Sequence, residues 1–395
     1  MKEDLYATTT DGRWQTRGAP GYLVSMFLLL LACAEPTVEV PPRADPDASG
    51  PYGIGVQTLE FTDARGKDMV AEIWYPATVS PDSTPDPYPE IPITLNAHRK
   101  ARADTRGAPY PLVAFSHGMG GIRYQSAFLC EFLASHGYVV VAMDHTHNTF
   151  LDMDESMSVQ VLLERPGDVT YTVDEVYRLA QSEDPTFAGM VDPEAGYAMM
   201  GHSFGAWTSM VVGGGVLSLQ SLVDYCAADH DSIACDYLAE VRDDSGQLDD
   251  AADPRVRVTL PLAPGVWYGF GDGGEGLREV VDPFVLGGDH DTVLPYETEI
   301  LPTYAAMAAP KQLGTLANAG HYAFSDICLI AAPLFDDCDE EAGGFINMER
   351  AHFITQTVIT AKLDSAMLGA SEAEAWLQPE WAEQNAPELR WESQP

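Results

Sequence analysis

The sequence predicts a fold of the α/β class, in which a mostly parallel central sheet carries helices on both faces. Two apolar runs, YPLVAFSHG at 110–118 and YVVVAMD at 138–144, have the continuous hydrophobicity of strands buried on both faces of a parallel sheet. Segments with helical periodicity alternate with such runs, as expected for a covered parallel sheet. The chain has 395 residues, of which 46% are hydrophobic, which is enough for a large core.

The folded part is expected to begin near Gly53. The stretches VQTLEFTD and VAEIWYP alternate apolar and polar residues, as two antiparallel strands do. Further strands are expected at 110–118, 138–144, 197–200, 255–262, 283–286 and 312–317, the last being the final strand of the sheet. Helices are expected at 123–135, 173–182, 206–212 and 345–367. Thr172 and Glu175 are spaced as a capping box at the start of the second helix.

Some stretches do not follow this alternation. Residues 145–169 are predicted to be a loop-rich excursion beyond a strand end, and residues 217–253, with a cysteine pair and many acids, a cap inserted over the site. Residues 34–52 are rich in Pro, Ala and Asp, which predicts a flexible tether. The main domain is expected to span 53–369, followed by an acidic C-terminal tail at 370–395 that packs loosely.

The first 33 residues have the features of a targeting segment. The apolar run Tyr22–Ala32 is too short to span a bilayer and ends at Cys33. The order Leu-Leu-Ala-Cys resembles a bacterial lipoprotein signal, in which the cysteine thiol is acylated. The leader before the run is long and carries three acids among three bases, so a start at Met26 and a buried apolar helix stay open as alternatives. We expect export, with a membrane tether if Cys33 is lipidated.

The charge balance excludes some partners. Sixty Asp and Glu against 21 Lys and Arg give a formal net charge of −39. A field of this sign repels phosphate backbones, so nucleic acid is not expected as a partner. It also disfavours polyanionic substrates and favours release of a carboxylate product. Solubility is the simplest explanation, and adaptation to a salty medium is the alternative.

The remaining cysteines fit an exported protein. Two local pairs lie in loop-like stretches, and we expect them to form short-loop disulfides. These pairs are Cys226 with Cys235 and Cys328 with Cys338. Cys130 lies in the apolar pattern of a helix and is expected to be a buried free thiol. The spacing contains no zinc signature, and neither a metal nor another cofactor is expected.

The strongest motif is the pentapeptide Gly201-His-Ser-Phe-Gly205. A G-x-S-x-G turn between a strand and a helix holds its serine in a strained, exposed conformation. Here the motif follows the apolar strand YAMM and opens a helical pattern, so its structural context is present. We therefore predict that Ser203 is a nucleophile, the alternative being an ordinary turn serine.

A serine nucleophile needs a base and an acid, which follow it in the order serine, acid, histidine in this kind of fold. The histidines downstream of Ser203 are His230, His290, His321 and His352. We favour His321, because it lies in the loop-like NAGHYAF after a strand. For the acid, Asp289 and Asp291 both follow the strand at 283–286, and a carboxylate there can orient the imidazole. We choose Asp291, with Asp289 as the competitor.

The oxyanion of a tetrahedral intermediate needs preorganised donors. One is expected to be the backbone N–H of Phe204, directly after the nucleophile. The other is expected from the glycine-rich loop His117–Gly121, with the Met119 N–H as the candidate. The alternative is a plain strand-to-helix turn.

Several side chains are candidates to line the substrate pocket. Trp267 and Tyr268 follow a strand end, where loops of such folds face the site, although a place in the core is equally compatible with the pattern. Trp207 lies in the helix after the nucleophile, where packing in the core is the stronger alternative. The full set of pocket candidates is His117, His202, Trp207, Trp267 and Tyr268.

The motifs HGMGG, GHSFG, GGDHDTVLPYE and AGHYAFSDIC occur in an order that resembles the α/β-hydrolase superfamily. The similarity is to its branch of platelet-activating-factor acetylhydrolases and polyester hydrolases, whose bacterial members are often labelled predicted dienelactone hydrolases. It covers roughly residues 50–369. It implies the α/β-hydrolase fold, a Ser/Asp/His triad, no cofactor and ester substrates. Dienelactone hydrolases use a cysteine nucleophile, so Ser203 speaks against that label as a statement of substrate.

The sequence thus predicts an exported serine carboxylesterase that acts on a small or polymeric ester; the oligomeric state stays open. An amidase or peptidase on the same triad is one alternative. A metal-dependent hydrolase is another, because Asp144, His145 and His147 follow a strand end. However, Thr149 stands where a binuclear HxHxDH pattern requires Asp. A binding protein that has lost catalysis is the third.

Overall fold

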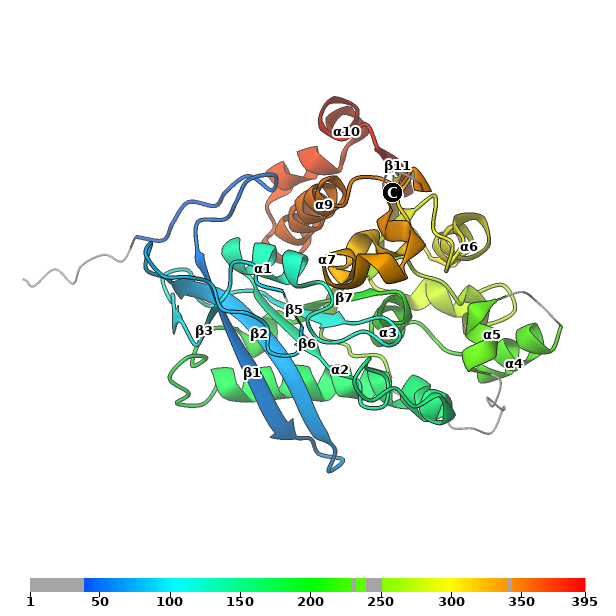
Figure 1. The fold of residues 1–395 in the computed structure, drawn as a ribbon, viewed down its shortest axis with the longest axis horizontal. Coiled ribbons are helices and arrows are strands. Elements are labelled where there is room, and N and C mark those ends of the chain that lie inside the picture. Colours follow the sequence, from blue (N-terminus) through cyan, green and yellow to red (C-terminus); the bar gives the residue numbers. More distant parts are fainter. Residues whose placement is uncertain (1–38, 92, 229–231, 239–250, 340–342, 395) are drawn as a thin grey trace, which may run out of the picture. The chain divides into compact units, whose positions relative to one another are not determined.

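The centre of the computed structural model is an 11-stranded sheet, ordered β11-β10-β9-β8-β7-β5-β6-β2-β1-β3, with β4 paired to β2 (Figure 1). The structure describes residues 39–91, 93–228, 232–238, 251–339 and 343–394. The predicted targeting segment with Cys33, the start of the predicted tether, His230 and part of the predicted cap lie outside the described residues. No helix in the described part is both long and apolar enough to cross a membrane.

The strands of the sheet are β1 (Gly53–Thr62), β2 (Asp68–Thr78), β3 (His98–Arg99), β4 (Arg102–Ala103), β5 (Leu112–Ser116), β6 (Val139–Met143), β7 (Tyr197–His202), β8 (Val256–Leu262), β9 (Phe284–Gly288), β10 (Lys311–Leu316) and β11 (Leu389–Gln394). The α-helices are α1 (Ala127–Ser135), α2 (Ser158–Ala180), α3 (Phe204–Val212), α4 (Leu219–Ala227), α5 (Ile233–Tyr237), α6 (Leu301–Ala306), α7 (Ile327–Ala331), α9 (Met348–Leu368) and α10 (Pro379–Asn385).

Strands β5 to β10 form a parallel core, and antiparallel strands flank it on both sides. Pairs β6–β5, β5–β7, β7–β8, β8–β9 and β9–β10 are all parallel. The hairpin β1–β2 is antiparallel and joins the core through an antiparallel β2–β6 pair. This arrangement confirms the predicted mostly parallel sheet.

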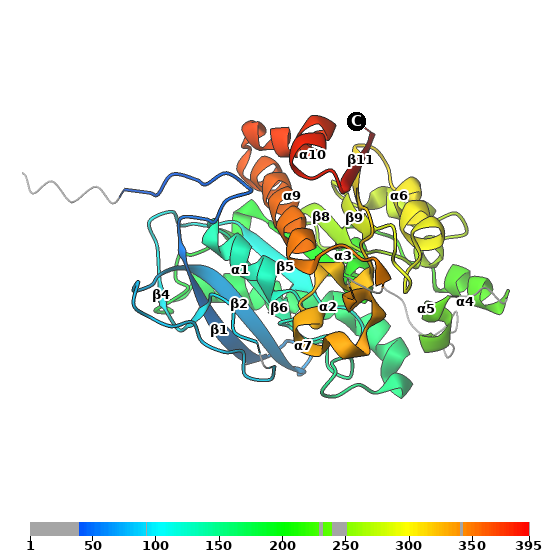
Figure 2. The ribbon, with the colours of Figure 1, turned by 45° about the horizontal axis from the view of Figure 1, so that its top comes forward.

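Helices cover both faces of the sheet, as the alternation of side chains along β6 shows. Val140 and Ala142 share a buried core with side chains of α1 and α9. Val139 and Val141 point to the opposite face and share a core with side chains of α2. Successive side chains of a strand point to opposite faces, so α1 and α9 cover one face and α2 the other (Figure 2).

Helix α2 is much longer than predicted, and the second half of the expected excursion at 145–169 belongs to it. The helix starts at Ser158 rather than Val173 and contains Pro166. Arg165 and Asp168, next to this proline, are buried and hydrogen-bonded, which holds the first half of the helix in place. The predicted capping box was therefore wrong: the Thr172 hydroxyl donates to the Asp168 carbonyl within the helix, at 2.8 Å.

The C-terminal segment 370–395 is not a loose tail. Its strand β11 pairs antiparallel with β10 along its whole length, so 312–317 is not the final strand of the sheet. Leu389 is buried, and Arg390 forms an ion pair with Asp289 at 2.9 Å. The acidic composition suggested a solvated tail. However, apolar and polar residues alternate at the start of β11, in the order Leu-Arg-Trp-Glu, and this pattern is sufficient for an edge strand.

The described part of the predicted tether also packs on the domain. The His136 imidazole donates from Nε2 to the Ala48 carbonyl at 2.8 Å, and the Gly50 N–H donates to Ser135 Oγ at 3.2 Å. Arg43 lies 3.7 Å from Asp364 of α9. These contacts order the chain before β1 begins.

Between β7 and β8, the predicted cap contains α4 and α5, which the Cys226–Cys235 disulfide joins. Glu299 links this segment to the domain. Its carboxylate accepts a hydrogen bond from the Val266 N–H at 2.7 Å and another from the Ser232 hydroxyl at 3.4 Å. Burial raises the pKa of Glu299 to about 7, although these hydrogen bonds oppose the shift.

We expect Glu299→Gln to change how stability depends on pH. Because the folded state binds the Glu299 proton more tightly than the unfolded state, the wild-type protein loses stability as pH rises from the unfolded pKa through about 7. An amide keeps an acceptor for Val266 without ionising. The variant should melt about 2–4 °C above the wild type at pH 8 and close to it at pH 5, as measured by scanning calorimetry. An equal difference in Tm at both pH values would contradict this assignment.

Candidate active site

A cavity of 170 Å³ opens where the parallel strands end. The loop after β5 supplies Gly118 and Met119, β7 leads into Ser203, and the loops after β9 and β10 supply Leu294 and His321. The carboxyl ends of parallel strands meet at the same edge of a sheet, so residues distant in sequence converge there.

Ser203 occupies a strained turn between β7 and α3. Its φ of 58° and ψ of −120° lie outside the regions that non-glycine residues favour. The Ser203 N–H donates to the Leu262 carbonyl at 3.0 Å, and the Ser203 carbonyl accepts from the Trp207 N–H at 3.1 Å. These bonds hold the turn, and the half-buried side chain lines the cavity.

The two glycines of the pentapeptide are needed for close packing. A Cβ on Gly205 would lie 1.8 Å from the Ser116 carbonyl oxygen, and one on Gly201 would lie 2.1 Å from the Gly205 oxygen. No side chain fits at either position. The turn can therefore approach β5 only with glycine on both sides of Ser203.

His321 and Asp291 form a buried hydrogen-bonded pair. The imidazole Nδ1–H donates to Asp291 Oδ2 at 2.7 Å, and the two side chains are almost fully buried. The other carboxylate oxygen accepts from the backbone N–H groups of Val293 and Leu294, at 2.9 and 2.7 Å. Within the described residues, Nε2 of His321 has no hydrogen-bond partner. The pair thus presents a free ring nitrogen beside the cavity.

The competing acid and bases lie elsewhere. Asp289 is bonded to the Asn318 N–H at 2.6 Å and to Arg390. His290 is half exposed and contacts Asp289 rather than the cavity. His352 stacks on Phe128 with ring centroids 3.5 Å apart, and burial lowers its pKa to about 4.

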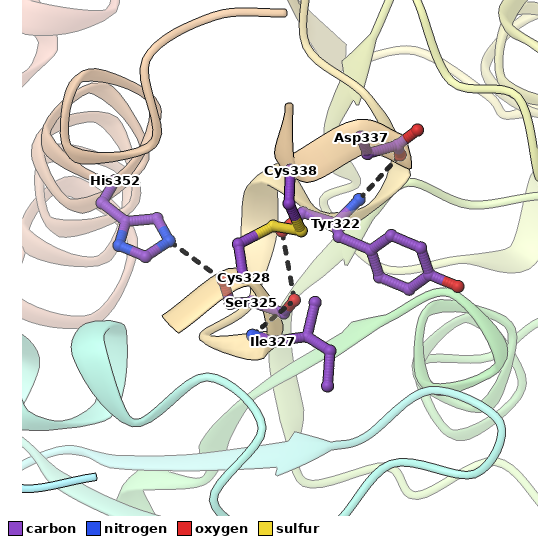
Figure 3. The surroundings of a disulfide bond; sticks show 7 residues. All are labelled: Tyr322, Ser325, Ile327, Cys328, Asp337, Cys338 and His352. Atoms are coloured by element: carbon purple, nitrogen blue, oxygen red, sulfur yellow. Dashed lines mark hydrogen bonds between the residues drawn. A yellow bond between two sulfur atoms is a disulfide. The ribbon is translucent and has the colours of Figure 1, made fainter. Parts of the chain in front are cut away.

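The second disulfide, Cys328–Cys338, closes the loop that follows His321, as the sequence predicts (Figure 3). Asp337 accepts a hydrogen bond from the Tyr322 N–H at 3.4 Å, directly beside His321. On the other side, the His352 Nε2–H donates to the Ser325 carbonyl at 3.1 Å. The loop that carries His321 is thereby fastened to α9 and to a cross-linked segment.

The predicted oxyanion donors lie at the cavity. Met119 and Phe204 both line it. Among the described residues, neither backbone N–H donates to a protein acceptor. Unpaired backbone donors at the wall of a cavity are suited to bind a developing negative charge.

Three of the five predicted pocket side chains are elsewhere. His202 and Trp207 line the cavity, but His117 is fully buried behind it. Tyr268 stacks on Tyr225 with ring centroids 3.5 Å apart, and Trp267 donates from Nε1 to the Thr298 carbonyl at 2.9 Å. These two aromatic residues pack beneath the α4–α5 segment because their loop turns toward it.

Sequence reasoning missed several lining residues because they come from distant segments. Leu162 comes from α2, which was not expected to extend that far. Ala234, Tyr237 and Leu238 come from α5 and its end, and their pattern in the sequence carries no pocket signal. The other missed lining residues are Gln125, Gly265, Val266, Val293, Leu294 and Tyr322.

A buried polar network supports the loop that carries Met119, and no pattern in the sequence indicates it. The Arg165 guanidinium, on α2, donates to the His117 carbonyl and to Ser116 Oγ. It also lies over the Phe204 ring, 4.2 Å from the centroid. Arg165 is fully buried, and burial lowers its pKa to about 9. One cation therefore contacts both segments that supply the candidate oxyanion donors.

Two of the three side chains that suggested a metal site, those of His145 and Asp144, are engaged in hydrogen bonds. His145 Nε2 lies 2.9 Å from Ser116 Oγ, and His145 Nδ1 lies 3.0 Å from Asp168. Asp144 binds Arg123 through both carboxylate oxygens. The described residues contain no group of three or more His, Cys, Asp or Glu side chains arranged to hold a metal ion.

Comparisons with known proteins find similarity to acetylhydrolases and cutinases. The family described as platelet-activating factor acetylhydrolase, isoform II, matches residues 89–153, which include the loop with Met119. Cutinase est1 of Thermobifida alba is 27% identical over 217 residues, covering 54% of each chain. Cutinase 2 of Thermobifida cellulosilytica is 26% identical over 216 residues, covering 54% of this chain and 61% of the relative.

Cutinase cut1 of Thermobifida fusca is also 26% identical and is covered over 50% of its length. The chain thus spans about half the length of the curated relatives it matches. The mostly parallel sheet with helices on both faces is an α/β-hydrolase type of fold, and the chain is similar to platelet-activating-factor acetylhydrolases and to cutinases.

Proposed function

We propose that the protein is a serine carboxylesterase. The observation that carries the proposal is the strained Ser203 in the wall of the same cavity as His321, whose other ring nitrogen is bonded to the buried Asp291. A serine hydroxyl is a weak nucleophile without a base, and this arrangement supplies one. The cutinase and acetylhydrolase relatives support ester hydrolysis as the reaction class.

In the proposed reaction, His321 takes the proton of the Ser203 hydroxyl while the oxygen attacks the ester carbonyl. The N–H groups of Met119 and Phe204 bind the oxyanion of the tetrahedral intermediate. His321 then protonates the leaving alcohol, and Asp291 stabilises the transient imidazolium. Water repeats these steps on the acyl-enzyme and releases the acid.

The cavity favours a short or narrow acyl group. Its walls are formed largely by apolar side chains, among them Leu162, Trp207, Leu238 and Leu294. A volume of 170 Å³ accommodates a short acyl chain. Short-acyl, lipid-type and polyester-like substrates all fit this description, and the relatives named as cutinases support a polymeric ester among them.

The proposal includes an exported protein. Two disulfides are consistent with an oxidising compartment. Attachment to a membrane through a lipid on Cys33 remains part of the proposal, and metabolic labelling with a fatty-acid analogue tests it.

The first prediction concerns the nucleophile and the base. Ser203→Ala and His321→Ala should each lower kcat for p-nitrophenyl acetate by roughly 10⁴-fold or more, because either change removes the acyl-transfer step. The matched control is Ser209→Ala, a buried serine of α3 whose hydroxyl, among the described residues, donates to the Ala206 carbonyl alone. It should retain activity. Equal rates for Ser203→Ala and Ser209→Ala would refute the serine mechanism and reopen the metal-dependent and non-catalytic alternatives.

The second prediction separates the two candidate acids. Asp291→Asn should lower kcat by about 10³–10⁴-fold, because an amide cannot stabilise the imidazolium and favours the wrong tautomer. Asp289→Asn is the matched control, since Asp289 bonds Arg390 and the Asn318 N–H instead of His321. It should mainly lower Tm. The reverse pattern in kcat would make Asp289 the acid.

The third prediction tests the acyl side of the cavity. Tyr237→Ala should raise the ratio of kcat/KM for p-nitrophenyl octanoate to that for the acetate by roughly tenfold, because it removes a half-buried wall. Tyr171→Ala, on α2 beneath Arg65, serves as a control outside the cavity. An unchanged ratio in Tyr237→Ala would mean that the acyl chain lies elsewhere. Parallel assays with p-nitroanilides distinguish an amidase from an esterase.

A further inference from the structure

Gln125 connects three parts of the candidate active site. It lies just before α1, its side chain is 9% exposed, and it lines the cavity. Its Oε1 accepts a hydrogen bond from the Gly118 N–H at 2.8 Å. Its Nε2 lies 2.8 Å from Nδ1 of His202, whose Nε2 lies 2.8 Å from the carbonyl oxygen of His321.

The direction of this chain of hydrogen bonds is fixed at both ends. A backbone N–H can only donate, so the oxygen of the Gln125 amide faces Gly118 and its NH₂ group faces His202. A carbonyl can only accept, so the proton of His202 is on Nε2 and is donated to His321. Nδ1 of His202 then accepts from Gln125, so each of the three contacts joins a donor to an acceptor.

His202 must stay neutral to accept a hydrogen bond from Gln125 at Nδ1 while it donates one from Nε2 to His321. Burial lowers its pKa to about 3, and the neighbouring charge of His321 acts in the same direction. The two rings have centroids 4.8 Å apart. A neutral His202 therefore donates a hydrogen bond to the backbone of the segment that carries the base, and it adds no charge beside that base.

The orientation of the Met119 N–H depends on the same contact. Gly118 C=O and Met119 N–H share one planar peptide group. The Gly118 oxygen accepts from His117 Nδ1–H at 2.7 Å and from the Gly121 N–H at 3.1 Å. With the Gly118 N–H held by Gln125, both ends of this residue are fixed, and the direction of the Met119 N–H is fixed with them.

We infer that Gln125 is a positioning residue, which holds the oxyanion loop and, through His202, the backbone of the base His321 in a single geometry. The inference rests on the proposed esterase function and assigns it a residue outside the triad. Gln125 does not take part in the bond changes, because both of its polar groups are occupied.

Two substitutions test this role. Gln125→Met keeps the length of the side chain but removes both hydrogen bonds. It should lower kcat for p-nitrophenyl acetate by about 10–100-fold with KM within about twofold, because the donors and the base lose alignment while the cavity remains. Gln356→Met is the matched control, since Gln356 too bonds the backbone of another element through its amide, donating from Nε2 to the Phe128 carbonyl at 3.0 Å, but does not line the cavity. It should leave kcat unchanged.

Gln125→Glu gives a readout that a purely structural role would not produce. While the new carboxyl group is protonated, one of its oxygens can still accept from the Gly118 N–H and its O–H can donate to Nδ1 of His202. Once that proton is lost at higher pH, a carboxylate faces the Nδ1 lone pair of His202 and the link to His321 breaks. The variant should therefore approach wild-type kcat at low pH and show a falling alkaline limb that wild type and Gln125→Met lack.

Wild-type kcat in Gln125→Met, or a pH profile of Gln125→Glu parallel to that of the wild type, would overturn the inference. The same holds if both variants change only Tm in scanning calorimetry. Failure of the proposed function is a separate result: wild-type protein would then neither hydrolyse the ester nor be labelled at Ser203 by a fluorophosphonate probe.

Discussion

The arrangement of the site depends on one steric constraint, the close approach of the Ser203 turn to β5. Gly205 packs against the Ser116 carbonyl at a distance that admits no Cβ, and Gly201 packs against Gly205 in the same way. This approach brings the end of β7 beside the loop after β5, so Ser203 and Met119 reach one cavity. The unfavourable backbone angles of Ser203 persist because neighbouring hydrogen bonds hold them.

This close packing requires that the loop after β5 be held in place, and a buried hydrogen-bond network holds it. Arg165 donates to Ser116 and to the His117 carbonyl, Ser116 bonds His145, and His145 bonds Asp168. Asp168 in turn accepts from Lys67 at 3.0 Å. Buried charges are costly unless they are paired and hydrogen-bonded, and this chain links the buried cation to a carboxylate. The network also explains why α2 continues through Pro166.

Predictions made from the local pattern of apolar residues were confirmed where the structural element depends on that same short segment. The continuous apolar runs became β5 and β6, and the alternating runs became β1 and β2. The predictions of a loose acidic tail and of a loop-rich excursion were wrong. The acidic tail contains β11, and the stretch at 145–169 contains the first half of α2. Edge pairing and the anchoring of a helix by buried side chains are tertiary effects, which override composition and local propensity.

The sequence by itself predicted the strands β1, β2 and β5 to β10, the glycine-flanked turn at Ser203 and both disulfide pairs. The turn can be predicted because only glycine tolerates so close an approach of the backbone. The disulfides can be predicted because each pair closes a short loop. Only the tertiary structure decided between Asp291 and Asp289 as the partner of His321, since both follow the same strand and differ in direction alone. It likewise placed Trp267 and Tyr268 beneath the α4–α5 segment and brought Gln125 to the cavity, because a pocket wall is assembled from segments that no local pattern connects.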